Sequence, residues 1–325
     1  GVRSSSNEVL LNLLLLREVA ADRDEAKSDI DTMSDESLRA FLEGQSAESV
    51  IGIDNNRLGE RVELNGLVPY PIRDGFVIPQ ASLSELFSDP ISYNNVPMII
   101  GSNLDGAKSV MLFEPDYVTW ILNRVPIIKD RDFFKMMSKL QSDLKFILGV
   151  QEPVKLLARS RRDIQAPPNI FVYRFDWSDI QSNLFGNWSQ LLRAGTSLEL
   201  DFVLDNFHQR EGLSNWSGET INSERNALTM SIMDYWGSFV YTGNPSRGRS
   251  GTLEEWVPWQ DRSKNTLLLD NSLKGQIRME ELRYEIESFK NRVISLLSEV
   301  KTTRKCKLAA ETLQKSTASS ALVPD

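Results

Sequence analysis

The sequence predicts an α/β protein in which a mostly parallel sheet is flanked by long helices. Three apolar runs have the length and composition of buried strands, at residues 96–101, 169–175 and 266–269. Long segments with helical periodicity separate these runs. Because parallel strands need long crossover connections, usually helical ones, strands spaced in this way indicate the α/β class.

The N-terminal part is predicted to be helical over residues 7–51, because apolar side chains recur there at helical spacing among good helix formers. Within it, Ser34 precedes a short helix that opens at Ser37 and Leu38 and ends at Gly44. The following segment, residues 52–97, is predicted to be rich in loops because four prolines interrupt it: Pro69, Pro71, Pro79 and Pro90.

The roughly 65 residues between the first two strands are predicted to be helical, including residues 117–125 and 133–150. A later helix is expected at residues 224–242. Its apolar face carries four large side chains: Leu228, Ile232, Trp236 and Phe239.

A C-terminal helix is predicted over residues 279–300, where apolar residues form a stripe. The stripe consists of Leu282, Ile286, Phe289, Val293, Leu296 and Val300. The small, polar residues 311–325 predict a loose tail.

Composition restricts the classes of function that the chain can have. Its 325 residues are 41% hydrophobic and 25% charged, which is typical of a soluble globular protein with a sizeable core. A net charge of 37 − 45 = −8 argues against a nucleic-acid partner, and no apolar run is long enough to span a membrane. One cysteine, Cys306, excludes an internal disulfide framework and a cysteine-based zinc site. No phosphate-binding loop or metal motif is found, so we expect no cofactor and no metal.

Few residues offer catalytic chemistry. The nucleophile elbow G-x-S-x-G is absent from the chain. The only histidine, His208, is a candidate general base or a solvated side chain that bonds locally. Asp105 follows a predicted strand, where α/β sites gather, but it also fits a turn-forming residue. Glu199 precedes an apolar stretch and also fits a structural hydrogen-bonding role.

Several strings, taken in order, resemble the type-B carboxylesterase (cholinesterase-like) family of α/β-hydrolases, with the bacterial members the most similar. NVPMIIGSNLDGAKS resembles the family strand that runs into G-T-N-x-D-E. LLRAGTSLELDFVLDNF is similar to L-L-G-A-x-H-x-x-E-I-P-F-V-F-G. MDYWGSFVYTGNPSRGRSGTLEEWVPW is similar to Y-W-x-x-F-A-x-T-G-x-P followed by W-P-x-W. The strings lie at residues 95–109, 191–207 and 233–259, and shorter ones at 71–80, 171–177 and 267–279 extend a resemblance covering roughly residues 7–290.

The resemblance implies that this chain is the C-terminal part of an α/β-hydrolase. Residues 1–290 would form that part of the carboxylesterase domain, lacking the half with the nucleophile elbow, and residues 291–325 a helix end and a loose polar tail. An export signal would lie in the missing N-terminal part. Family members are often secreted or periplasmic, and the sequence leaves the compartment of this protein open.

The resemblance also assigns the two catalytic positions expected in this part of the domain. The family acid is the Glu of G-T-N-x-D-E, and the aligned residue here is Gly106. The family histidine stands three residues before the Glu of H-x-x-E; with Glu199 as that Glu, the aligned residue is Thr196. A threonine hydroxyl cannot accept the serine proton near neutral pH, and glycine has no carboxylate to orient an imidazole.

Two functions remain open. By family the chain is a carboxylic-ester hydrolase, but its residues predict a catalytically degenerate homologue that binds a partner, such as a small apolar ester or lipid-like ligand. The alternative is an active serine esterase. In that case a missing N-terminal part supplies the nucleophile, and His208 and Asp105 are recruited as base and acid.

Overall fold

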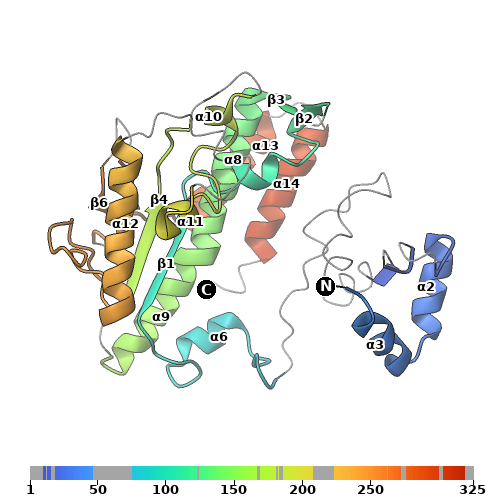
Figure 1. The fold of residues 1–325 in the computed structure, drawn as a ribbon, viewed down its shortest axis with the longest axis horizontal. Coiled ribbons are helices and arrows are strands. Elements are labelled where there is room, and N and C mark those ends of the chain that lie inside the picture. The colour runs from blue at the N-terminus through green and yellow to red at the C-terminus, as the bar shows by residue number, and fades with distance from the viewer. Residues whose placement is uncertain are drawn as a thin grey trace. The chain divides into compact units, whose positions relative to one another are not determined.

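The computed structural model describes most of the chain. The described residues are 10–11, 13–15, 19–46, 75–122, 124–166, 169–180, 182, 186–207, 223–261, 263–271, 276–299 and 303–318. They belong to two compact units, Gly1–Gln80 and Ala81–Asp325 (Figure 1).

The first unit contains helices α2 (Arg23–Thr32) and α3 (Asp35–Glu43). The Asp22 carboxylate accepts hydrogen bonds from the first backbone N–H groups of α2, and Ser34 caps α3 in the same way. The prediction of helices in this region is confirmed. However, α3 begins at Asp35 rather than at Ser37, and residues 33–34 separate the two helices because the cap residues have extended backbones.

A short helix, α6 (Leu83–Ser88), lies in the segment predicted to be rich in loops. Ser82 and Glu85 form a capping box: the Ser82 hydroxyl accepts from the Glu85 backbone, and the Glu85 carboxylate accepts from the Ser82 backbone. The S-x-x-E spacing at residues 82–85 is the local signal for this helix.

The sheet has four strands in the order β1–β4–β5–β6. Strands β1 (Met98–Asn103), β4 (Ile170–Phe175) and β5 (Thr266–Leu269) are parallel, and β6 (Arg278–Glu280) runs antiparallel to β5. The three predicted strands and the mostly parallel α/β architecture are therefore confirmed.

Helices cover both faces of this sheet. Figure 1 shows β1 and β4 between α12 (Ser223–Thr242) on one side and α8 (Arg131–Phe146) and α9 (Glu152–Asp163) on the other. Successive residues of β4 point to opposite faces. Ile170 and Val172 belong to an apolar cluster with side chains of α9, whereas the Phe171 and Tyr173 rings contact Phe239 and Trp236 of α12. The predicted helix at residues 224–242 is confirmed.

Helix α8 (Arg131–Phe146) continues through a π-helical turn (Ile147–Gln151) into α9 (Glu152–Asp163), as its helical pattern predicts. The helix prediction for residues 117–125 is wrong, because strand β2 (Val118–Ile121) lies there and pairs antiparallel with β3 (Val125–Ile128). Apolar side chains occur on both faces of this hairpin, so the alternation that marks a half-buried strand is missing.

The C-terminal prediction needs two corrections. Met279 lies in strand β6, and the last long helices are α13 (Ile286–Glu299) and α14 (Thr303–Ala318). The predicted apolar stripe is confirmed within α13, where Phe289, Val293 and Leu296 are buried. Part of the tail predicted to be loose is helical up to Ala318, and α14 contributes the buried Ala309 to the main core.

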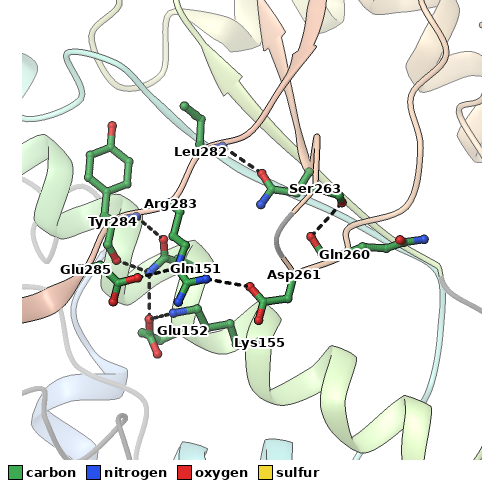
Figure 2. Close-up of polar contacts among 11 residues, drawn as sticks. Gln151, Glu152, Lys155, Gln260, Asp261, Ser263, Leu282, Arg283, Tyr284 and Glu285 are labelled. Carbon is green, nitrogen blue, oxygen red and sulfur yellow. Dashed lines mark hydrogen bonds and ion pairs between the residues drawn. The ribbon is translucent and has the colours of Figure 1, made fainter.

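The π-helical turn is connected to the segment between β6 and α13 by a network of polar contacts (Figure 2). The buried Gln151 amide donates to the Tyr284 carbonyl at 2.7 Å and accepts from the Tyr284 N–H at 2.8 Å. Arg283 lies 3.7 Å from the Asp261 carboxylate, and Lys155 lies 2.8 Å from Glu152. These contacts fix the chain where it leaves the sheet for α13.

Three further short helices lie among the described residues of the second unit. These are α7 (Lys108–Met111), α10 (Trp188–Leu191) and α11 (Glu199–Leu204). Helices α7 and α11 flank the candidate functional site described next.

Candidate functional site

The candidate site lies where β1 ends and the chain turns into α7. Parallel strands collect functional loops at their carboxyl ends, and β1 ends at Asn103. The loop before α11, residues 193–198, meets this turn: the Asp105 N–H donates to the Ala194 carbonyl at 3.0 Å. The structure thus brings together two segments that are far apart in the sequence.

The two positions that the resemblance assigns to the family acid and histidine are in direct contact. The Thr196 hydroxyl donates a hydrogen bond to the Gly106 carbonyl over 2.7 Å, across 90 residues of sequence. The Ser109 hydroxyl donates to the Thr196 carbonyl at 3.2 Å and connects the same loop to α7. A side chain–backbone bond therefore occupies the space between these two positions.

Gly106 has little room for a side chain. A Cβ atom built at this residue would lie 3.1 Å from the Thr196 hydroxyl oxygen and 3.2 Å from the Asn103 carbonyl oxygen. Its backbone is outside the left-handed region, so an L-residue is conformationally acceptable. Placing a carboxylate at position 106 thus requires the Thr196 side chain to move or to be replaced.

Asn103 and Glu199 clamp the same two segments together. The Asn103 amide donates to the Gly195 carbonyl at 2.6 Å and to the Glu199 carboxylate at 2.5 Å. The Asn103 side chain is buried. The pKa of Tyr173 is raised, chiefly because the Tyr173 hydroxyl is itself buried and secondly because Glu199 places a negative charge nearby. Glu199 thus accepts a hydrogen bond that joins α11 to the end of β1.

The Asp105 carboxylate is occupied by two cations. Its oxygens lie 3.0 Å from the Lys108 ammonium and 3.5 Å from the Arg193 guanidinium. Lys108 is only 4% exposed, and this burial lowers the pKa of its ammonium, although the charge of Asp105 opposes the shift. Asp105 is thus held in an ion-pair cluster at the start of α7.

His208 lies outside the described residues, so the structure gives no position for this candidate base. Among the residues that the structure does describe, no group of three histidine, cysteine, aspartate or glutamate side chains is arranged to hold a metal ion. The helices in the described ranges include none that is both long and apolar enough to cross a membrane.

Three residues of this site were missed at the level of sequence: Asn103, Lys108 and Arg193. Lys108 could have been noticed in the sequence, because it is a charged residue that opens a short apolar stretch, the one that forms α7 and packs into the core. Arg193 and Asn103 carried none, because their partners are distant in the sequence.

Comparison with known proteins gives a consistent picture. The model of the Carboxylesterase family matches residues 117–287, a range that includes Thr196 and begins beyond Gly106. The chain is 24% identical over 240 residues to the para-nitrobenzyl esterase of Bacillus subtilis (strain 168), an alignment covering 70% of this chain and 45% of that protein. The chain therefore spans about half the length of the curated relative that it matches.

Solved structures described as PNB esterase are also similar. One has a TM-score of 0.46 at 18% identity and covers 80% of this chain and 52% of its own. Another has a TM-score of 0.42 at 21% identity, with coverages of 76% and 49%.

Proposed function

The chain belongs to the carboxylesterase family, and we propose that it is a catalytically degenerate member that does not hydrolyse esters by the family mechanism. Its function would then be that of a binding or scaffold protein. The ligand class that follows from the family is a small apolar ester or a lipid-like molecule, held without being cleaved.

One observation carries this proposal: the hydrogen bond between Thr196 and the Gly106 carbonyl. The family mechanism needs an imidazole to take the serine proton and a carboxylate to orient that imidazole. The positions aligned with these groups hold a hydroxyl and a backbone carbonyl, and neither changes its protonation near neutral pH. Because the two residues satisfy each other, the pair forms a stable contact with no basic group.

The competing function is an active serine esterase in which Asp105 and His208 replace the aligned residues. The surroundings of Asp105 argue against this, because its carboxylate already faces Lys108 and Arg193. A carboxylate that orients a histidine needs a free oxygen within hydrogen-bond reach of the ring. Oδ1 of Asp105 pairs with Lys108, whereas Oδ2 is buried without a hydrogen-bond partner and lies 3.5 Å from Arg193. A histidine that bonded to Oδ2 would become positively charged beside the Arg193 guanidinium, which opposes the recruitment.

The test is hydrolysis of p-nitrophenyl acetate and butyrate, measured on this chain and on the full-length product of its gene. We expect no turnover above the solvent rate from the wild type, and no labelling by a fluorophosphonate probe that reacts with activated serines. The Asp105→Asn and His208→Ala variants serve as matched controls. Turnover that His208→Ala abolishes would instead support the active esterase.

The double variant Gly106→Glu/Thr196→His separates loss of the triad from loss of the whole site. The double variant removes the Thr196 hydroxyl that a Cβ at position 106 would meet at 3.1 Å, and the Asn103 carbonyl oxygen at 3.2 Å has to shift slightly. If the full-length double variant gains turnover, the rest of the site is competent and only these two residues are degenerate. If it stays inactive while folding normally, further elements of the site have been lost as well.

A further inference from the structure

Arg161, in the last turn of α9, is a buried cation that forms no ion pair with any described residue. Its side chain belongs to a residue that is only 3% exposed, and two of its three guanidinium nitrogens, Nε and Nη2, are buried without a hydrogen bond. A buried charge without a partner is far more costly than an exposed one. In native proteins such a group usually marks the place of a bound ion or water, or a functional role.

The contacts that Arg161 does make hold its guanidinium in one orientation. Its third nitrogen, Nη1, donates a hydrogen bond to the side-chain carbonyl of Asn169, the residue before β4. The Tyr93 ring lies over the guanidinium, with its centre 5.7 Å from Cζ. A hydrogen bond of 2.6 Å joins the Tyr93 and Ser160 hydroxyls and keeps the ring in place. The edge of the guanidinium formed by Nε and Nη2 is therefore the part left without a partner.

The carboxylates on the surrounding segments do not bond to this guanidinium. On α6, which packs against α9, Glu85 takes part in the capping box, and Asp89 accepts hydrogen bonds from the loop that follows α6. Asp163, at the end of α9, is exposed. Asp261 follows the segment that contacts the start of β4, and its carboxylate pairs with Arg283. The described part of the chain thus supplies no anion to the Nε and Nη2 edge.

We propose that the Nε and Nη2 edge of Arg161 binds the carboxylate of a small organic acid. The N–H groups on this edge are parallel, and the two oxygens of a carboxylate match their spacing, so two charge-assisted hydrogen bonds form side by side. One carboxylate neutralises the one positive charge. A phosphate would bring additional charge and oxygens next to the apolar cluster against which Tyr93 packs. This inference does not depend on the function proposed for the β1 site.

Tyr93 covers the proposed site. Because Nε and Nη2 are closed off from solvent, the anion enters when the Tyr93 side chain moves away, or it is enclosed as the chain folds. Tyr93 belongs to the loop between α6 and β1, in which the neighbouring Ile91 is 90% exposed. The contact of the Tyr93 ring with Arg161 and its hydroxyl bond to Ser160 oppose this movement, so we expect slow exchange of the bound anion.

The test is a titration of the full chain with ¹³C-labelled acetate, followed by ¹³C NMR, at an ionic strength kept constant with sodium chloride. We expect saturable binding of acetate. In urea denaturation, acetate at a hundredfold excess over its Kd should raise the equilibrium constant for folding about a hundredfold relative to chloride. Inorganic phosphate is the comparison ligand. Absence of saturable acetate binding would overturn the site, and tighter binding of phosphate would overturn the choice of a carboxylate.

The Arg161→Lys variant keeps the positive charge but loses the paired N–H groups, so it should weaken acetate binding at least about tenfold. The matched control is Arg159→Lys, at an exposed position of α9, which should leave the affinity unchanged. Circular dichroism checks that both variants fold. Tyr93→Ala keeps Arg161 and removes its cover, and should speed the exchange of bound acetate. Equal affinities of the two arginine variants, or exchange from Tyr93→Ala no faster than from the wild type, would overturn the proposal.

Discussion

Gly106 and Thr196 show how two residues of little chemical reactivity form a self-contained contact. The carbonyl of one accepts the hydroxyl proton of the other, and the bond joins the β1 turn to the loop before α11. Around it, Asn103, Glu199 and Ser109 add three further bonds between the same segments. At this scale, hydrogen bonds hold the β1 turn against the loop before α11.

The Thr196→Val variant should lower the free energy of unfolding by about 1 kcal/mol, the usual net value of one such hydrogen bond. Thr196→Ser keeps the hydroxyl and should cost less. Urea denaturation followed by tryptophan fluorescence measures both. Equal losses for the valine and serine variants would contradict a stabilising role for this bond.

Lys108→Met should destabilise the protein by about 3 kcal/mol, because it leaves the Asp105 carboxylate with only the more distant Arg193. The double variant Lys108→Met/Asp105→Asn removes both charges and should recover part of this loss. Lys307→Met breaks an exposed pair with Glu311 and should cost less than about 1 kcal/mol. A double variant less stable than the single one would show that Lys108 acts through something other than this pair.

At the scale of elements, helix and strand predictions succeeded where one periodicity dominated. Residues 224–242 and 169–175 carry clear helical and strand patterns, and α12 and β4 form there. The β2–β3 hairpin was mistaken for a helix because its two faces are both apolar. Pro126 lies opposite Trp120 in this hairpin, a position that an edge strand accepts.

The Gln151→Leu variant tests the connection between the π-helical turn and the segment before α13. It removes both hydrogen bonds to the Tyr284 backbone and leaves a part-buried carbonyl and N–H without these bonds. We expect a loss of about 2 kcal/mol in the free energy of unfolding. Gln190→Leu, at an exposed position of α10, is the control and should change stability by less than about 0.5 kcal/mol.

The docking of α14 should depend on pH through Asp130. The pKa of Asp130 lies below its ordinary value. The hydrogen bond from Lys305 is the largest cause, and the hydrogen bond from the Phe133 N–H is the second. Folding therefore favours the ionised form, so the stabilisation is fully present above about pH 4 and is lost as the pH falls further. The Asp130→Asn substitution keeps a side-chain oxygen that caps α8 and removes the negative charge. The melting-temperature difference between wild type and Asp130→Asn should thus be largest near neutral pH and shrink in acid.

For the whole molecule, the second unit is organised around aromatic side chains on the sheet face that α12 covers. Trp256 contacts Phe171, Tyr173, Tyr235 and Trp236, and its indole donates to the Val172 carbonyl at 3.1 Å. It therefore joins β4, α12 and the loop after α12. All seven tryptophans of the chain follow residue 80, so tryptophan fluorescence reports on this unit alone.

Trp256→Ala should lower the free energy of unfolding by about 4 kcal/mol, because it leaves a large cavity in a 1% exposed position. Urea denaturation followed by fluorescence should show a lower midpoint with an unchanged slope. An unchanged midpoint would mean that this aromatic cluster is not part of the cooperative core. Leu42→Ala, at an exposed position of the first unit, should leave the fluorescence midpoint in place.

The sequence by itself determined the α/β class, the three parallel strands, α12 and the family, because periodicity and ordered motifs are local properties of the chain. Only the tertiary structure decided that Thr196 bonds to Gly106 and that Asp105 is paired with Lys108 and Arg193. Contacts with Thr196 and Arg193 join segments roughly 90 residues apart. They depend on how the loop before α11 packs against the end of β1, and no local pattern encodes that packing.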